Sequence, residues 1–486
     1  MAPQLSPEHS ADTSKLQVIA NQLKASFSAR KTHSLESRLH LLQQLEALVQ
    51  DNQTQICAAI SEDLGRPTDD SILAELSVVI EEIQEARRHL KKWMSPEKKM
   101  MPLVLFPARG WISPVPYGVV LIIGPWNYPF QLLLAPLASA LAAGNSAVVK
   151  PSELTPRCSA LIAQLIGQYL PADVVQVIEG DAQVSKALLQ EKWDFIFFTG
   201  STQVGRLVAQ AAARHLTPVV LELGGKSPCI IDDTANLRVA AKRILWGKML
   251  NAGQTCVAPD YIFAPHAQVE PLLAEIKLVL KEFFPNGFSR RETFCGIVNQ
   301  GHYDRLKNML DAHRSELRLG GTTDAGAKLI EPSFFVLPSK ELTKAPLMGE
   351  EIFGPLMPII GYHHVQEAID FINSNEHPLT LYVFSKDKNL IANVENQTRS
   401  GSFVVNDTVI QLATSQLPFG GIGASGMGAY HGKTGFLVFS HKRAVLSRPF
   451  WLDLPVRYRP FAPWKLWILK KLFGYQQPKP LPSPLP

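Results

Sequence analysis

The sequence is poor in cysteine, and nothing in it would pair the few cysteines that it has. Its 486 residues include five, none in a CxxC pair and none in a tight cluster with histidine. No stretch is typical of a signal peptide. We therefore expect free thiols, a reducing and cytoplasmic location, and no structural zinc or other metal site. The five are Cys57, Cys158, Cys229, Cys256 and Cys295.

The main body of the chain lacks net charge. The formal net charge is +5, but residues 446–486 alone contain seven basic residues and one acidic residue. The rest of the chain holds 41 basic and 42 acidic residues. A near-neutral body gives no electrostatic support for nucleic-acid binding, so we expect no nucleic-acid partner.

The chain also lacks an uninterrupted apolar run. No charged residue occurs between Arg109 and Lys150, but prolines and polar residues divide this stretch into GVVLII, LLLAPLASALAAG and SAVVK. Short apolar runs of this kind are typical of strands buried on both faces of a parallel sheet. The stretch therefore predicts a strand, a loop, a helix and a second strand.

The pattern along the chain predicts an α/β fold of two or three domains. Helical spacing dominates up to about Trp93, and from Tyr117 onward strands alternate with helices. Successive βαβ units form a doubly wound parallel sheet, whose usual ligand is a nucleotide at the carboxyl ends of the strands. A second α/β series begins after Lys226.

Two stretches after predicted strands are suited to binding a nucleotide. In GSTQVG, residues 200–205, glycines allow a close backbone approach and the amides of a helix start can face a pyrophosphate. Because the full GxGxxG pattern is missing, an ordinary strand-to-helix turn is the alternative. Lys150 and Glu153 in VVKPSE suit ribose hydroxyls, with a solvated turn as the alternative.

Three residue types suited to catalysis occur in separate stretches. Cys256 in NAGQTC is either a small buried hydrophobe or a nucleophile. Asn127 in GPWNYPF either satisfies backbone groups or donates to a developing oxyanion. Glu222 ends an apolar strand, where burial would raise its pKa and suit it to act as a general base; a structural ion pair is the alternative.

Taken in order, seven motifs resemble the aldehyde dehydrogenase superfamily from about residue 15 to 445. Two stretches, LELGGKSPC and LYVFSKD, are most similar to its class 3 branch, which includes fatty aldehyde dehydrogenases. The motifs are PWNYP, VVKPSE, FTGSTQVG, LELGGKSP, NAGQTC, EEIFGP and PFGGIGASGMG. The resemblance implies a Rossmann-type NAD(P)-binding domain, an α/β catalytic domain, a bridging arm and a homodimer. The implied ranges are residues 15–95 and 115–224 for the NAD(P)-binding domain, residues 225–407 for the catalytic domain, and residues 96–114 and 408–438 for the bridging arm.

The resemblance also implies a role for individual residues. Cys256 takes the position of the nucleophile, Glu222 that of the general base and Asn127 that of the oxyanion-hole amide. Glu351 and Phe353 in EEIFGP match residues that hold the nicotinamide ribose. The cofactor-binding positions are Lys150, Glu153, Gly200, Ser201, Val204, Gly205, Glu351 and Phe353.

These residue types suit the oxidation of an aldehyde to an acid. A thiolate adds to the aldehyde, hydride leaves the thiohemiacetal, and the thioester must then be hydrolysed. A water-activating Glu222 favours hydrolysis over transfer to coenzyme A, which is an alternative outcome. Glu153 would repel the 2′-phosphate of NADP, so we expect NAD to be preferred and NADP tolerated.

The basic, aromatic tail of residues 446–486 bears on the substrate. WKLWILKKLFG, residues 464–474, is too short to span a bilayer, but its tryptophans and lysines suit a helix at a membrane surface. Packing on a partner subunit or over the substrate entrance is the alternative. A membrane-facing enzyme would meet lipophilic substrates: long-chain alkanals, alkenals, retinal or other apocarotenals. The runner-up function is a catalytically inactive peripheral membrane or scaffold protein.

Overall fold

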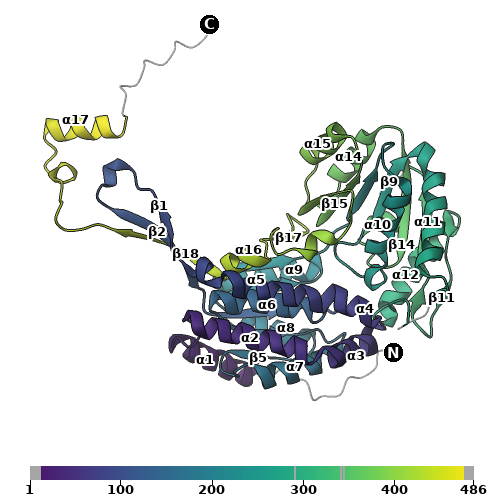
Figure 1. Cartoon of the computed structure of the whole chain (residues 1–486), viewed down its shortest axis with the longest axis horizontal. Coiled ribbons are helices and arrows are strands. Elements are labelled where there is room, and N and C mark those ends of the chain that lie inside the picture. The colour runs from purple at the N-terminus through teal and green to yellow at the C-terminus, as the bar shows by residue number, and fades with distance from the viewer. Residues whose placement is uncertain (1–12, 289–291, 340–341, 343–344, 475–486) are drawn as a thin grey trace, which may run out of the picture. The chain divides into compact units, whose positions relative to one another are not determined.

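The computed structural model describes residues 13–288, 292–339, 342 and 345–474. Backbone contacts divide this part of the chain into two units. The first contains the residues up to Trp93 together with Pro116–His441, and the second contains Met94–Val115 and the residues from Lys442 onward (Figure 1).

The predicted parallel sheet is present in the first unit. Its strand order is β17-β7-β6-β3-β4-β5, and only β17 runs antiparallel to its neighbour. Every residue of β3, β4 and β6 is buried, as expected of strands covered on both faces. The strands are β3 (Val119–Ile123), β4 (Ser146–Lys150), β5 (Val175–Val177), β6 (Phe195–Thr199), β7 (Val219–Glu222) and β17 (Gly426–Met427).

Helices cover this sheet, and α2 and α3 add a further layer that packs on α6 and α7. Helix α6 is buried along its whole length, which explains its apolar sequence. A π-helical turn, η2 (Ile72–Leu76), separates α4 from α5. The helices are α1 (Thr13–Ser28), α2 (Leu35–Asp51), α3 (Gln53–Leu64), α4 (Thr68–Ser71), α5 (Ser77–Met94), α6 (Gln131–Ala143), α7 (Pro156–Tyr169), α8 (Ala182–Gln190), α9 (Thr202–His215) and α16 (Gly432–Val438).

A second sheet follows in the same unit, in the order β10-β13-β14-β9-β8-β15-β16, with only β10 antiparallel to its neighbour. Its strands are β8 (Pro228–Ile231), β9 (Tyr261–Pro265), β10 (Leu317–Leu319), β13 (Ser333–Leu337), β14 (Leu356–Tyr362), β15 (Thr380–Phe384) and β16 (Ser402–Val405). A separate hairpin pairs β11 (Thr323–Asp324) with β12 (Leu329–Ile330).

Helices and short turns connect these strands. The helices are α10 (Leu237–Met249), α11 (Val269–Phe283), α12 (Gln300–Ala312), α13 (Pro346–Gly349), α14 (Val365–Asn373) and α15 (Lys388–Gln397). Three 3₁₀ turns, η4 (Leu250–Gly253), η5 (His266–Gln268) and η7 (Ile410–Ala413), complete the connections. The predicted α/β architecture with two α/β series is therefore confirmed.

The second unit contains little regular structure. Strands β1 (Glu97–Lys99), β2 (Arg109–Pro116) and β18 (Ser440–Ser447) form a three-stranded sheet. Turns η3 (Leu103–Leu105) and η8 (Pro455–Arg457) and helix α17 (Pro463–Leu472) complete it. Residues 408–438, predicted to join 96–114 in a bridging arm, lie in the first unit, and the strand that pairs with β2 begins at Ser440. The bridging role stays a prediction.

Candidate active site

The ends of four neighbouring parallel strands bring several predicted site residues to one edge of the first sheet. Ile123 at the end of β3 pairs with Lys150 at the end of β4. Thr199 at the end of β6 pairs with Glu222 at the end of β7. Because these strands are parallel, the loops that follow them leave from the same edge, which is where a doubly wound sheet binds its ligand.

Cys256 reaches this region on a strained turn that follows α10. The backbone is left-handed at Asn251, Ala252 and Gly253, with φ values of 50°, 53° and 75°. A Cβ added to Gly253 would lie 2.3 Å from the carbonyl oxygen of Gly354, so only glycine fits there. Strained backbone of this kind persists only where the surrounding structure imposes it.

Cys256 lines two cavities that differ in the number of polar groups in their walls. The first, about 220 Å³, contains Cys256 with most of the predicted catalytic and cofactor-binding residues, and we call it the polar cavity. Its lining residues are Pro125, Trp126, Asn127, Leu132, Thr199, Gly200, Ser201, Glu222, Leu223, Gly224, Cys256, His302, Arg305, Glu350, Glu351 and Phe353.

The second cavity, about 110 Å³, has an almost wholly apolar lining, and we call it the apolar cavity. The π-helical turn, the α10 end and the η7 region supply its walls. The lining residues are Leu73, Ala74, Val78, Tyr128, Gln131, Leu132, Trp246, Leu250, Thr255, Cys256, Val409, Ile410, Leu412, Ala413, Phe419 and Tyr430. A lining of this kind suits an aliphatic or polyene group.

The Asn127 side chain is buried and held against the turn that carries Cys256. Its amide donates to the carbonyl of Gln254 over 3.1 Å. Its own backbone carbonyl accepts hydrogen bonds from Asn251 and Arg66. An amide nitrogen carries two N–H donors, so one fixes the orientation of the side chain and the other is left for a ligand.

Glu222 and Cys256 lie in an environment that disfavours negative charge. Neither carboxylate oxygen of Glu222 has a hydrogen-bond partner among the residues that the structure describes, and burial raises the pKa of this carboxyl well above its ordinary value. Burial, followed by the charges of Glu351 and Glu222, raises the pKa of the Cys256 thiol to about 12. Burial therefore disfavours the ionised form of both groups, and a base must remove the proton of the Cys256 thiol.

The Glu351 loop is held in place by two charged side chains. Arg305 on α12 donates to the carbonyl of Ile352 over 2.6 Å, and Asp260 accepts from the Ile352 N–H at 3.3 Å. Burial and then the neighbouring Asp260 raise the pKa of Glu351 to about 8. Phe353, with a φ of 50°, meets the Trp126 ring edge-on at a centroid distance of 5.5 Å.

The turn after β6 fits the pyrophosphate of a dinucleotide. Ser201 caps α9, and its hydroxyl accepts from the Val204 N–H at 3.4 Å. A Cβ added to Gly200 would lie 2.5 Å from the Phe198 ring, so the backbone at this point has no room for a side chain. The amides of the first turn of α9 are thus presented at the edge where the loops converge.

The remaining predicted cofactor residues lie outside the lining of the polar cavity. The buried ammonium of Lys150 pairs with the carboxylate of Glu153 over 2.9 Å, at the end of β4. Val204 is 43% exposed on α9. Gly205 is buried, and a Cβ there would lie 2.5 Å from the Leu223 side chain, so it allows α9 to pack closely on the chain after β7.

Several lining residues were not predicted from the sequence. Trp126 belongs to the PWNYP motif that was used for Asn127 alone. His302 and Arg305 are three residues apart on α12, a spacing that places them on one helix face. This spacing is common on solvated helices, so it gives no functional indication before the fold is known.

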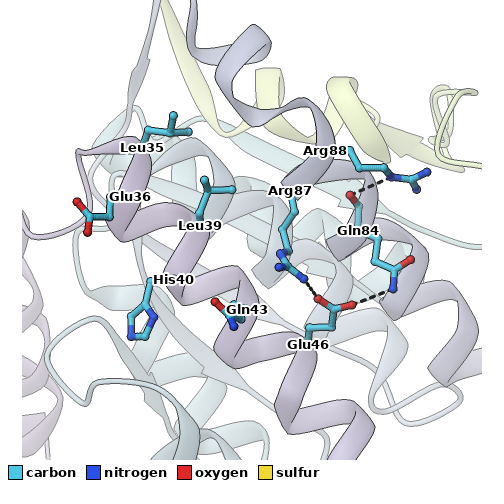
Figure 2. Close-up of a pocket in the computed structure, with 9 residues that line it drawn as sticks. All are labelled: Leu35, Glu36, Leu39, His40, Gln43, Glu46, Gln84, Arg87 and Arg88. Carbon is cyan, nitrogen blue, oxygen red and sulfur yellow. Dashed lines mark hydrogen bonds and ion pairs between the residues drawn. The ribbon is translucent and has the colours of Figure 1, made fainter.

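A wider hollow of about 1070 Å³ lies on α2 and α5, and Figure 2 shows that its lining includes none of the predicted site residues. Its charged groups largely satisfy one another: Gln84 donates to Glu46 over 2.8 Å, and Arg87 pairs with the same carboxylate. We interpret it as an ordinary groove between surface helices rather than a site of chemistry.

Comparison with known proteins agrees with this fold. The model of the aldehyde dehydrogenase family matches residues 6–445. A 4,4'-diaponeurosporen-aldehyde dehydrogenase of Staphylococcus aureus is 41% identical over 90% of this chain and 95% of its own. A Canis lupus familiaris enzyme named "Aldehyde dehydrogenase, dimeric NADP-preferring" is 39% identical over 92% of this chain and 98% of its own. A solved structure, described as the substrate bound state of Staphylococcus aureus AldH, has a TM-score of 0.91 at 39% identity and covers 94% of this chain and 99% of that chain.

With two α/β sheets, strand ends that converge on a cysteine, and a family match along nearly the whole sequence, this chain belongs to the aldehyde dehydrogenase family. It is an NAD(P)-dependent oxidoreductase that oxidises aldehydes. Among its relatives are several named as family 3 aldehyde dehydrogenases, and within the family it falls in the class 3, fatty aldehyde dehydrogenase-like branch.

Proposed function

We propose that this enzyme oxidises lipophilic aldehydes to carboxylic acids through a covalent adduct on Cys256, with Asn127 as oxyanion donor and Glu222 as general base. The observation that carries the proposal is the position of Cys256 in the wall of both cavities. An aldehyde whose chain lies in the apolar cavity would have its carbonyl carbon next to the Cys256 sulfur. The polar groups of the polar cavity would then act on the adduct from the opposite side of the sulfur.

Cys256 supplies the nucleophile. Its sulfur accepts hydrogen bonds from its own backbone N–H and from that of Val257, which favour the thiolate against the effect of burial. Attack on the aldehyde carbon moves the negative charge to the aldehyde oxygen. The free N–H of Asn127 and the Cys256 backbone N–H are the donors for that oxyanion.

The cofactor, when bound, supplies the acceptor for the hydride that leaves the thiohemiacetal carbon. Gly200, Ser201, Glu351 and Phe353 line the polar cavity and are the residues that would hold it. The resulting Cys256 thioester must be hydrolysed. Glu222, once ionised, would take a proton from the attacking water, which favours hydrolysis over transfer of the acyl group to coenzyme A.

The substrate class follows from the apolar cavity and from the relative whose name contains diaponeurosporen-aldehyde. Long-chain alkanals, alkenals and polyene aldehydes such as retinal and other apocarotenals are the compounds that match an apolar lining next to a nucleophile. Leu73 and Ile410 are partly exposed lining residues, so the apolar surface continues to the outside of the unit.

The deciding experiment measures NADH formation from an aldehyde series, hexanal to hexadecanal and retinal, with Cys256→Ala as the control. We expect efficiency to rise with chain length and the control to be silent. Activity that falls with chain length would contradict the lipophilic substrate class. If neither protein forms NADH or NADPH from any aldehyde, the proposed mechanism is wrong and an inactive scaffold is favoured.

We also propose that NAD is preferred and NADP tolerated. The support is the Glu153 carboxylate at the end of β4, whose charge would oppose a 2′-phosphate at an adenosine ribose. Lys150 pairs with this carboxylate and offsets part of the charge, which is why NADP would still bind. The proposed preference for NAD over NADP is therefore modest, because it depends on the single ion pair between Lys150 and Glu153.

A lipid surface is the partner that suits the second unit. In the part of the chain that the structure describes, no helix is both long and apolar enough to cross a membrane. Helix α17 instead presents exposed aromatic side chains, with Trp464 at 52%, Trp467 at 63% and Phe473 at 67% exposure. Lys465 and Lys471 lie near the tryptophan rings. Aromatic and basic side chains on one short helix suit a membrane–water interface.

A homodimer is the assembly that we propose. The three-stranded sheet of β1, β2 and β18 has two outer strands, and outer strands of this kind can add a strand from another chain. The dimeric relative supports the same assembly. Sedimentation of the full chain would test it, and a monomer at micromolar concentration would contradict it.

A further inference from the structure

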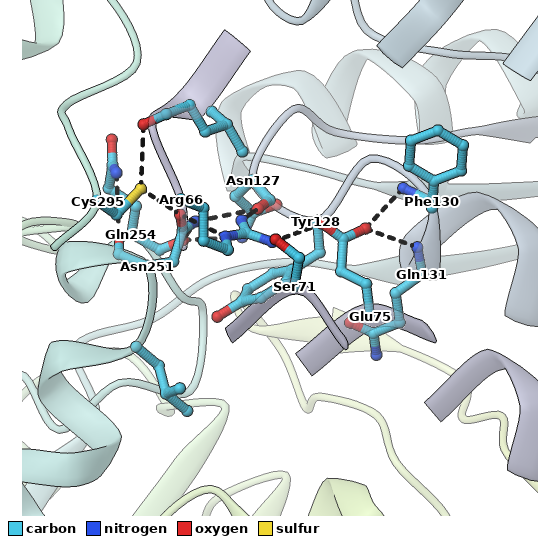
Figure 3. Close-up of polar contacts among 12 residues, drawn as sticks. Arg66, Ser71, Glu75, Asn127, Tyr128, Phe130, Gln131, Asn251, Gln254 and Cys295 are labelled. Carbon is cyan, nitrogen blue, oxygen red and sulfur yellow. Dashed lines mark hydrogen bonds and ion pairs between the residues drawn. The ribbon is translucent and has the colours of Figure 1, made fainter. Parts of the chain in front are cut away.

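A buried arginine connects the two loops that carry the predicted catalytic groups. Arg66 follows α3 and is fully buried. Its Nε donates to the Asn251 side-chain oxygen over 3.2 Å, and one terminal nitrogen donates to the backbone carbonyl of Asn127. Its guanidinium also lies 4.6 Å from the centre of the Tyr128 ring. One rigid, planar group therefore contacts both the Asn127 loop and the turn before Cys256 (Figure 3).

The partner of Arg66 is a buried carboxylate that holds the other end of the Asn127 loop. Glu75 accepts from Arg66 over 2.5 Å. Its second oxygen accepts from the backbone N–H groups of Phe130 and Gln131, over 2.8 and 3.0 Å, at the start of α6. The ion pair thus holds the loop at two points, as Figure 3 shows. Arg66 donates to the backbone carbonyl of Asn127, and Glu75 accepts from the backbone N–H of Gln131.

The contacts continue to the cysteine turn. The Asn251 side chain donates to the carbonyls of Asn127 and Gln254, over 3.0 and 3.1 Å. The carbonyl of Gln254 also accepts the Asn127 amide, so the two loops are joined directly as well as through Arg66. The distance between the Asn127 amide and the Cys256 sulfur is therefore set by one connected group of buried hydrogen bonds.

The π-helical turn explains how Glu75 reaches this position. Leu73 and Ala74 of the same turn line the apolar cavity, while Glu75 points to Arg66 and α6. An additional residue in one helical turn changes the direction of the side chains that follow, and such turns are frequent at functional sites. The wall of the apolar cavity and the support of the Asn127 loop are thus parts of one element.

We propose that Arg66 and Glu75 are positioning residues, which hold the Asn127 amide in the place where the oxyanion forms on the Cys256 adduct. The inference rests on the proposed function, because it assigns the pair to the step that needs the oxyanion donor. Neither residue touches the substrate. Their effect is transmitted through the Asn127 carbonyl, the Asn251 amide and the start of α6.

The test is Arg66→Lys, which keeps the charge but loses the planar fork that contacts both loops. We expect the single-turnover formation of NADH and kcat to fall about 10- to 100-fold, because small displacements of a reacting group cost that much. The KM for the aldehyde should change less than kcat, since Arg66 itself lines neither cavity. The matched control is Arg38→Lys: Arg38 is also buried and donates to two backbone carbonyls, of Thr32 and Ala142, but lines neither cavity.

Unchanged single-turnover rates in Arg66→Lys, with an active wild type, would overturn the positioning role alone. Equal losses in Arg66→Lys and Arg38→Lys would also overturn it, because the effect would then be general destabilisation. If Arg66→Lys does not fold, Glu75→Gln is measured instead with the same expected loss, and a wild-type rate in it would overturn the inference. A wild type without aldehyde-dependent NADH formation would overturn the proposed function and this inference together.

Discussion

The side chain of Asn127 donates to the backbone carbonyl of Gln254 over 3.1 Å, two residues before Cys256. The donor that we assign to the oxyanion is therefore tied to the turn that carries the nucleophile. When the turn moves, the donor moves with it. This contact preserves the geometry between the two groups, although Asn127 lies in the loop after β3 and Cys256 lies after α10 and η4.

Replacing Asn127 by alanine should slow the attack of Cys256 on the aldehyde. Removal of one oxyanion donor costs about 3 kcal/mol, so kcat should fall roughly 100-fold. Pre-steady-state NADH formation is the appropriate measurement, because it reports the steps up to hydride transfer. A burst rate equal to that of the wild type would exclude Asn127 as an oxyanion donor.

Replacing Glu222 by glutamine should separate hydride transfer from hydrolysis. The burst of NADH should remain, while steady-state turnover should fall about 100-fold or more, because the base for the attacking water is lost. Mass spectrometry of the stalled enzyme should then find an acyl group on Cys256. An unchanged steady-state rate would show that another group activates the water.

Replacing Glu351 by glutamine should make the Cys256 thiol more acidic. Burial is the main reason for its raised pKa, and the charge of Glu351 is the next. Because the pKa of Glu351 is itself raised to about 8, its charge acts mainly above that pH, and the difference between the variant and the wild type should grow there. Alkylation of Cys256 by iodoacetamide, followed against pH, measures the shift.

The control for that experiment is Glu350→Gln, which removes a neighbouring, more exposed carboxylate that pairs with Arg305. The alkylation profile of this variant should stay close to that of the wild type. If both variants shift the profile equally, the effect is one of general surface charge. If neither does, the raised pKa of Cys256 is due to burial and to the charge of Glu222.

Replacing Glu153 by glutamine should raise the efficiency with NADP relative to NAD. The variant loses one negative charge and leaves the Lys150 ammonium free to attract a phosphate. The Glu153 carboxylate is 41% exposed, and ion pairs of exposed groups contribute up to about 1 kcal/mol, so we expect a change of about 2- to 5-fold in the ratio of kcat/KM values. Glu62→Gln, at a carboxylate that pairs with Arg157 elsewhere, should leave the ratio unchanged.

Removing residues 446–486 should weaken binding to vesicles of anionic lipid and lower the turnover of hexadecanal, while turnover of hexanal is spared. A subtler change, Lys470→Gln with Lys471→Gln, should weaken binding to anionic vesicles by about 2 kcal/mol and have little effect with zwitterionic lipid. Co-sedimentation with the two vesicle types measures both. Equal binding of the full and shortened chains would exclude the tail as a membrane anchor.

The strands and the loops that follow them could be predicted from the sequence because each has a local pattern. Apolar runs such as SAVVK mark a strand, and the residue after the run must lie at the sheet edge. Lys150, Gly200 and Glu222 could be placed in this way. For Cys256 the motif could be recognised but its geometry could not, because a left-handed backbone is uncommon for an alanine such as Ala252.

The supporting contacts could not be predicted in the same way. Arg66 and Asn251 are 185 positions apart in the sequence, and nothing around Arg66 distinguishes it from a surface arginine after a helix. The π-helical turn that directs Glu75 has an ordinary helical sequence, ILAEL. Such contacts depend on how helices and strands from distant parts of the sequence pack together, and a local sequence pattern does not predict that packing.

The two cavities share only Cys256 and Leu132 among their lining residues. Under the proposed function, the aldehyde chain and the nicotinamide cofactor would thus contact almost separate sets of residues. One set could be substituted while the other stays constant, except at Cys256 and Leu132, which line both cavities. Substitutions in the apolar cavity could therefore change the substrate range of this enzyme while its binding of the nicotinamide cofactor stays the same.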